Sequence, residues 1–202
     1  MNEITSTGWG VLDEARGMLR AAVAGVPADG WPRATPCAEW NVTQVLQHAA
    51  LDQRAWGAAV GGTESPGENP FAPSGQLGDE PLAYAEAALA ASAPAWAPVS
   101  EDAGPVPTPL PSGPMPPADA AAAAALDAAI HAWDIAVATG QGSPLTPELA
   151  RALTPVARRI VEPLRQYGAY AQALEPEPGA DDAAALLCYL GRRPGWTAQR
   201  DS

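Results

Sequence analysis

Apolar residues recur every three to four positions through most of the chain, which is the period of amphipathic helices. The first such segment, "STGWGVLDEARGMLRAAVAGV", is predicted to be a helix that ends before Pro27, because proline cannot continue a helix. Its apolar stripe consists of Trp9, Leu12, Leu19, Ala22, Val23 and Val26. The β-branched and aromatic runs that mark strands are missing, so the pattern predicts an all-α protein.

A second helix is predicted from about Val42 to Val60. Asn41 is placed to cap its first turn, and Gln44 follows three residues later, as in a capping box. Gly61 and Gly62 are expected to end this helix. The segment that follows, "TESPGENPFAPSGQLGDE", is predicted to be a long loop, and loops of such length are often functional or mobile.

Two further helices are predicted on either side of a proline-rich connection. The third lies within "EPLAYAEAALAASAPAWA", with Asp79 as its cap. The segment "VSEDAGPVPTPLPSGPMPP" is expected to be extended and polyproline-like. The fourth helix is predicted to begin near Pro117–Asp119 and to run to Gly140.

The last part of the chain is predicted to add a fifth helix and a short sixth one. "TPELARALTPVARRIVEPLRQYG" has Thr146 as cap and Pro147 at the first helical position, and Pro155 is expected to kink or split the helix. "ADDAAALLCYLGRRPGW" contains the short helix. We therefore expect a four-helix bundle with long crossover connections at residues 1–142. A helical extension at 143–202 is expected to pack on the bundle, so that the whole chain forms one domain.

Composition narrows the classes of function. The 202 residues suit one domain, and much of the 47% hydrophobic content is alanine, which favours closely packed helices. The net charge is −12 and all 11 basic residues are arginine, so chemistry that needs a lysine is excluded. An acidic chain is also unsuited to neutralising phosphates, which argues against a nucleic-acid partner.

The two cysteines and the N-terminus indicate a cytoplasmic protein. "MNEITSTGWG" lacks the basic and apolar regions of a secretory signal, so we expect Cys37 and Cys188 to stay reduced. No stretch approaches the ~18 uninterrupted apolar residues of a membrane helix. We expect both thiols to be packed, although Cys37, just ahead of the second helix, has the alternative of a reactive thiol.

Candidate chemistry gathers around the only two histidines of the chain, which both lie in helices that otherwise read as buried. Asp127, His131 and Asp134 are spaced i, i+4 and i+7, so they share one helical face. His48 lies on the second helix, on a face that it shares with Val45 and Asp52. Helical bundles build metal sites from inward-facing side chains of different helices, and two imidazoles with one carboxylate suit a divalent ion.

We interpret His48, Asp127 and His131 as three ligands of one divalent cation. Three protein ligands leave coordination positions open, which distinguishes catalytic from structural zinc. For Asp134 we favour the role of a partner that holds the His131 ring, with a fourth ligand as the alternative. Histidines that are merely hydrogen-bonded in the core are the alternative for both rings.

Several other residues lie near these motifs or could meet a substrate. We expect Asp52 to pair with Arg20 or Arg54 at the surface, outside the ligand set. Trp40 and Trp133 are expected to pack the helices that carry the two histidines. Four arginines have two open interpretations, a solvated surface or a clamp for a substrate carboxylate: Arg158, Arg159, Arg192 and Arg193.

The motif "TPCAEWNVTQVLQH", followed much later by "DAAIHAWDIAVATG", resembles the metal-binding domain of mycothiol-dependent maleylpyruvate isomerases. It resembles still more the actinobacterial branch of DinB-like metal-binding proteins, as do "AGVPADGWPRATPC" and "LLCYLGRRPGW", so that the similarity runs from about Leu12 to Trp196. The resemblance implies a DinB-like bundle with one divalent metal, often zinc. It carries the ligand roles to His48, Asp127 and His131, with an Asp where the isomerases have a Glu.

One departure limits what the resemblance implies. The isomerases carry a further C-terminal α/β domain that helps to bind substrate and thiol, whereas the residues after Gly140 read as helices here. We therefore expect a metal-dependent addition, transfer or isomerisation that uses a mycothiol-type thiol on a small electrophile, without inheriting the specific isomerisation. Zinc is the first choice of metal, with nickel, iron and manganese as alternatives.

Other functions stay open beside this one. A hydrolase or isomerase could use metal-activated water without a thiol, and a tailoring step on a natural product would fit the same site. We favour an enzyme over a non-catalytic metal-binding protein or a metal-free helical interaction module. Two-fold dimers are the commonest assembly of soluble proteins, so a homodimer is the assembly to test first.

Overall fold

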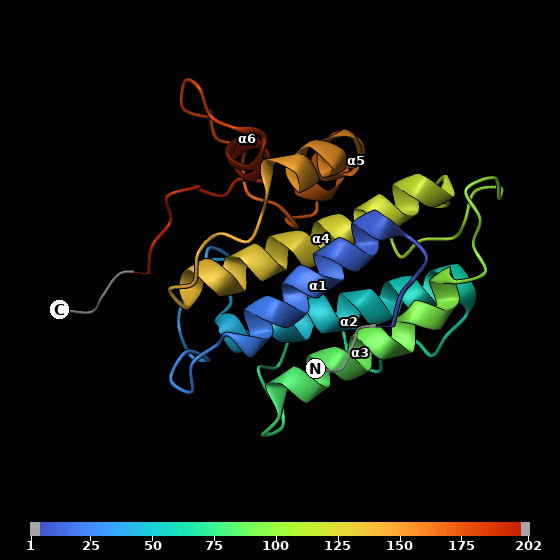
Figure 1. Cartoon of the computed structure of the whole chain (residues 1–202), viewed down its shortest axis with the longest axis horizontal. Coiled ribbons are helices and arrows are strands. Elements are labelled where there is room, and N and C mark those ends of the chain that lie inside the picture. The colour runs from blue at the N-terminus through green and yellow to red at the C-terminus, as the bar shows by residue number, and fades with distance from the viewer. Residues whose placement is uncertain (1–4, 199–202) are drawn as a thin grey trace.

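A computed structural model describes residues 5–198 as helices joined by loops (Figure 1). Within this range there is no strand beyond two isolated bridges, so the all-α prediction is confirmed. The elements, in chain order, are α1 (Gly10–Ala24), α2 (Val42–Gly61), α3 (Pro81–Trp96), α4 (Pro117–Ala138), α5 (Pro147–Arg165) and α6 (Asp182–Tyr189).

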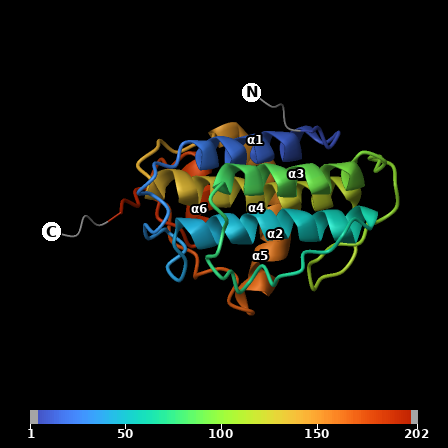
Figure 2. The ribbon, with the colours of Figure 1, turned by 90° about the horizontal axis from the view of Figure 1, so that it is seen from below.

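The first four helices form the bundle, and they lie side by side along its length in Figure 2. Extensive contacts join α1 to α4, α2 to α3 and α2 to α4. The fifth helix packs on the outer side of α4, and α6 packs on α5, as Figure 1 shows. The expected four-helix bundle is thus present, with further helices covering one of its sides.

The alanine-rich α4 lies at the centre of this arrangement. It contacts α1, α2 and α5, and nearly all of its residues are buried. Among the described residues it is the one helix that is long and apolar enough to cross a membrane by length and composition, and 83% of that stretch is buried inside the protein. Its composition therefore matches its place in the core, where small side chains let the neighbouring helices approach closely.

The start and the end of α2 follow local chemistry. The Asn41 side chain accepts a hydrogen bond from the Gln44 N–H at 3.0 Å, and the Gln44 side chain accepts one from the Asn41 N–H at 3.1 Å, which confirms the capping box. The helix runs through Gly61 and ends at Gly62, whose φ of 67° is left-handed. A Cβ at Gly61 would lie 2.5 Å from the Cα of Ala95, so this glycine lets α2 and α3 pack closely.

The predicted cap of α3 is wrong, and of the two alternatives for Pro155, a kink or a split, the split is not found. The cap of α3 is Glu80, not Asp79, and no side chain caps its N-terminus. Pro155 does not split α5, which continues through it. The buried stripe of α5, which includes Leu149, Leu153 and Val156, packs against the bundle and offsets the hydrogen bond that the proline removes.

One buried charge stands out in the bundle core. Arg16 of α1 is completely buried, and its Nη2 donates to the backbone carbonyl of Leu89 in α3. Its Nε and Nη1 have no hydrogen-bond partner among the described residues. Burial lowers the pKa of Arg16 to about 10, although the nearby Asp13 acts in the opposite direction. The folded state therefore holds a guanidinium whose lost hydration is poorly replaced.

Replacing Arg16 by an apolar side chain of similar length should stabilise the protein. We expect Arg16→Met to raise the free energy of unfolding by about 1–4 kcal/mol, because it removes a buried charge without a carboxylate partner. Urea unfolding monitored by circular dichroism measures the change. The matched control is Arg20→Met on the same helix, which removes a half-exposed ion pair with Glu86 and should alter stability by about 1 kcal/mol or less. A lower stability for Arg16→Met would contradict this account.

Candidate metal site

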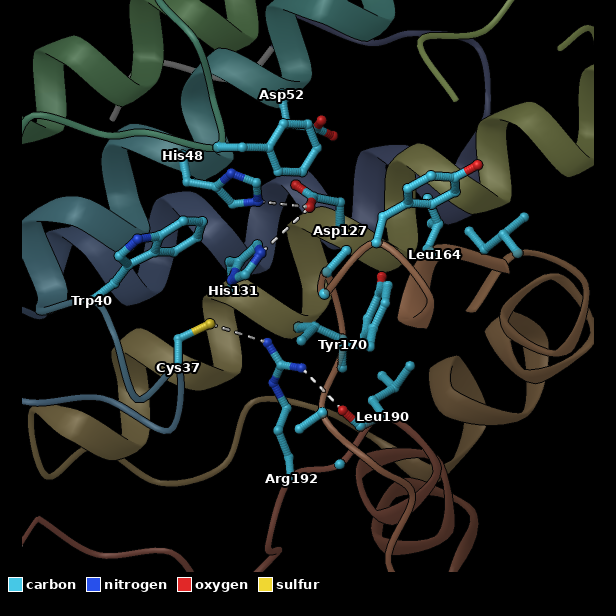
Figure 3. Close-up of a pocket in the computed structure, with 18 of the residues that line it drawn as sticks. Cys37, Trp40, His48, Asp52, Asp127, His131, Leu164, Tyr170, Leu190 and Arg192 are labelled. Atoms are coloured by element: carbon cyan, nitrogen blue, oxygen red, sulfur yellow. Dashed lines mark hydrogen bonds and ion pairs between the residues drawn. The ribbon is translucent and has the colours of Figure 1, made fainter. Parts of the chain in front are cut away.

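The three predicted ligands meet between two neighbouring helices of the bundle. His48 lies in the middle of α2, whereas Asp127 and His131 lie one turn apart on α4 (Figure 3). The Asp127 Oδ1 is 3.5 Å from the His48 Nε2 and 3.4 Å from the His131 Nε2. The two imidazole rings stand nearly perpendicular, with centroids 4.6 Å apart. All three donor atoms lie within 4.8 Å of one another.

Hydrogen bonds on the far side of each ring orient the two histidines. The His48 Nδ1 is 2.8 Å from the carbonyl oxygen of Pro70, which can only accept, so Nδ1 carries the proton. The His131 Nδ1 donates in the same way to the Asp134 Oδ2 at 3.0 Å. Both Nε2 atoms are therefore the ones that face Asp127, and each can bind a metal in its unprotonated form.

The chemistry of this donor set fits a divalent cation. The second carboxylate oxygen of Asp127, Oδ2, is buried without a hydrogen-bond partner in the part of the chain that the structure describes. A buried carboxylate oxygen without a donor is costly, and a cation would satisfy it. Two imidazole nitrogens and one carboxylate suit zinc and other ions of borderline softness.

The ionisation of Asp127 and His131 is linked. Burial opposes a charge on either group, but the neighbouring His131 and His48 rings hold the pKa of Asp127 well below its usual range. For His131, burial also favours the neutral ring, but the carboxylates of Asp127 and Asp134 outweigh it and raise its pKa to about 10. In the metal-free site His131 thus carries a second proton, on the Nε2 atom that faces Asp127. This second proton must leave when a cation binds.

An ion pair from the end of the chain holds Asp134. Arg192, which follows α6, donates from Nε to Oδ1 at 3.0 Å and from Nη2 to Oδ2 at 2.8 Å. Both side chains are buried. Burial disfavours the charge on Asp134, but Arg192 and then His131 keep its pKa below the usual value. The structure thus places Asp134 beside His131, on the side away from the ligand atoms.

The predicted surface pairing of Asp52 is wrong. Asp52 lines a cavity next to Asp127, whereas Arg20 pairs with Glu86 at 2.6 Å. Burial, together with the negative charge of Asp127, raises the pKa of Asp52 well above its usual value. Asp52 lies one helical turn after His48, so the spacing places both on one face of α2, but it does not show that this face is covered by the C-terminal part of the chain.

A cavity of about 660 Å³ opens onto the three residues. Its walls come from the turn before α2, from α2 and α4, and from two segments of the C-terminal part, 160–171 and 190–192 (Figure 3). Trp40 packs on the His48 ring with centroids 4.7 Å apart, and Phe71 packs on it from the loop after α2 at 5.7 Å. A small molecule can therefore reach the ligand atoms.

The remaining candidate residues divide between core, surface and cavity. Trp133 and Cys188 are buried, and Cys37 lines the cavity as a half-buried free thiol, 3.6 Å from the Arg192 Nη2. Burial first, and then the nearby Asp134 charge, raises the pKa of Cys37, so its thiol is not activated. Three of the four arginines are exposed and do not line the cavity: Arg158, Arg159 and Arg193.

Sequence reasoning missed the role of Arg192. Its position after the last helix belongs to no periodic pattern, and it meets Asp134 58 residues away in the chain. Of the two interpretations considered for this arginine, neither includes a buried ion pair. No spacing rule applies over such a separation, so the sequence contained no local signal for this contact.

Comparison with known proteins agrees with the fold. A family model described as the mycothiol maleylpyruvate isomerase N-terminal domain matches residues 12–136, which include both histidines and Asp127. Two proteins from Mycobacterium tuberculosis are each 30% identical over 185 residues, covering 86% of this chain and 92% of theirs: the uncharacterized protein MT0763 of strain CDC 1551 / Oshkosh and the uncharacterized protein Rv0738 of strain ATCC 25618 / H37Rv. No solved structure gives a significant match. The chain belongs to the family of the mycothiol maleylpyruvate isomerase N-terminal domain.

Proposed function

We propose that the protein is a divalent-metal-dependent enzyme that adds or transfers a mycothiol-type thiol to a small electrophilic molecule. The observation that carries the proposal is the convergence of three metal-ligand atoms, from His48, Asp127 and His131, at the wall of a cavity large enough for small molecules. Membership of a mycothiol-related family supports the choice of thiol. Zinc is our first choice of cation, since two imidazoles and a carboxylate are common zinc ligands.

Each residue of the site has a separate task in this proposal. His48, Asp127 and His131 hold the cation, and it would lower the pKa of a coordinated thiol so that the nucleophilic thiolate forms near neutral pH. Asp134 fixes the His131 ring through Nδ1, and the Pro70 carbonyl fixes the His48 ring. The cavity walls position the electrophile and limit the access of water.

The surroundings of Asp134 favour a catalytic over a structural metal. A structural zinc site is closed by four protein ligands, and Asp134 is the residue that the sequence offers as a fourth. Both of its oxygens are already bonded to Arg192, and Oδ2 also accepts from His131. Because Asp134 is bonded to Arg192 and His131, it is not available as a fourth ligand. Three protein ligands would then hold the cation and leave coordination positions open to a thiol.

A thiol-independent hydrolase or isomerase is the second candidate. Its support is Asp52, a cavity-lining carboxyl group whose pKa is raised by burial and by the Asp127 charge. A carboxyl group with a raised pKa can serve as a general acid or base near neutral pH. Assays with and without thiol separate the two candidates.

Removal of the carboxylate ligand should abolish metal binding. We expect Asp127→Asn to weaken zinc affinity by more than about 100-fold, which is beyond the usual effect of losing a residue that only supports a ligand. Elemental analysis of untagged protein, followed by competition with a chromogenic chelator, measures content and affinity. Asp119→Asn on the same helix is the matched control, because Asp119 pairs with Arg159 at the surface, and it should retain the metal. Equal zinc content in both variants would contradict the ligand assignment.

Turnover should depend on both the thiol and the metal. With 1-chloro-2,4-dinitrobenzene as electrophile, we expect zinc-loaded protein to catalyse consumption of mycothiol, and His48→Ala to reduce this rate to the spontaneous one. The rate is followed by absorbance, with Asp119→Asn again as the control. Isothermal titration should also detect mycothiol binding to the zinc-loaded protein. Absence of thiol binding would contradict the proposal, even if the metal is present.

Metal binding should release a proton from His131. Since a cation competes with a proton whose pKa is raised to about 10, zinc affinity is expected to rise about tenfold per pH unit between about pH 6.5 and 8. Isothermal titration in buffers with different ionisation enthalpies counts the released protons. The pKa of His131 in the folded protein lies above its ordinary value of 6.5, so its contribution to the stability of the metal-free protein is complete below pH 6.5 and is lost as the pH rises toward 10. Zinc affinity that does not change with pH would contradict this assignment.

A further inference from the structure

The walls of the cavity are mainly apolar and aromatic. Large side chains from four parts of the chain line it: Trp40, Trp56, Ile130, Ile160, Leu164 and Tyr170. A volume of about 660 Å³ is typical of sites that enclose small organic ligands. Figure 3 shows the Tyr170 ring reaching into the space between Asp127 and Arg192, where its hydroxyl is a neutral hydrogen-bond donor.

The only arginine that lines the cavity among the described residues is not available to a ligand, and His131 is held between Asp127 and Asp134. Arg192 forms a two-point ion pair with the buried Asp134 and also donates to the Leu190 carbonyl at 3.4 Å. If a substrate carboxylate took Arg192, Asp134 would be left as a buried charge without its partner. The guanidinium is therefore neutralised within the protein.

The other charges of the site do not favour an anion either. Glu39 lines the cavity at its exposed side, and Asp127 is at its floor. In the proposed function, a divalent cation held by Asp127 and carrying one thiolate has no remaining net charge. A substrate carboxylate would thus face apolar walls, a neutral centre and a protein of net charge −12.

We propose that the second substrate is an uncharged, largely apolar small molecule, and that the C-terminal part of the chain selects it. This proposal rests on the proposed function for the thiol. The apolar walls and the paired Arg192 affect any ligand of the cavity, whether or not a thiol is used. The residues that carry the selection, Ile160, Leu164 and Tyr170, lie after the range 12–136 that matches the family. The candidate metal ligands thus lie within the part that matches the family, whereas the substrate class is set by α5 and the segment that follows it.

Two unreactive ligands that differ in charge test the proposal. Methyl 2-naphthoate and 2-naphthoate are titrated calorimetrically into metal-free protein and into zinc-loaded protein saturated with mycothiol. We expect the ester to bind at least about tenfold more tightly in both states, because only the carboxylate must lose its hydration, and His131 and Arg192 are already paired with carboxylates of the protein. Equal or tighter binding of 2-naphthoate by the metal-free protein would overturn the proposal.

A variant that adds a cation to the cavity wall shows whether the missing positive charge, and not only the apolar surface, weakens the binding of carboxylates. Leu164→Arg is expected to improve 2-naphthoate binding at least about tenfold relative to the ester, and Leu164→Met should keep the native preference. Tyr167→Arg provides a second cation at a position that is 76% exposed, where the fold is unaffected. Failure of both arginine variants to improve carboxylate binding would overturn the proposal. Absence of mycothiol turnover with the ester preference intact would instead overturn only the proposed function.

Discussion

The close packing of α4 against its neighbours is the constraint on which the site depends. Alanine at most core positions of this helix lets α1, α2 and α5 approach it at once. This approach brings His48 of α2 within reach of Asp127 and His131 of α4. A larger side chain in the seam between α2 and α4 would separate the donors, so the same small residues that build the core also set the spacing of the ligands.

Periodicity predicted the features that depend on one helix or on one pair of helices. The faces of α2 and α4 and the capping of Asn41 follow rules of local spacing, and the two histidines fell on the correct faces. Contacts between distant segments were not predictable in this way. Asp52 faces inward because α5 and the residues after it cover that side of the bundle, and Arg192 reaches Asp134 from beyond the last helix. Tertiary packing also overrides the preference of Pro155 to break α5.

The site combines two parts of the chain with different roles. The bundle supplies the ligand atoms and their orienting hydrogen bonds, apart from the contribution of Arg192 through Asp134. The C-terminal part supplies a wall of the cavity and, through Arg192, neutralises the charge behind His131. The candidate ligands and the wall that faces them are therefore separate parts of the chain, and a substitution in one need not disturb the other.

The ion pair of Asp134 with Arg192 also has a consequence for biosynthesis. During translation, all three ligand residues emerge from the ribosome before Arg192 does. Until then Asp134 lacks its cationic partner, so the carboxylate that orients the His131 ring is a charge without compensation. Completion of the last segment therefore secures the orientation of a ligand that was synthesised much earlier.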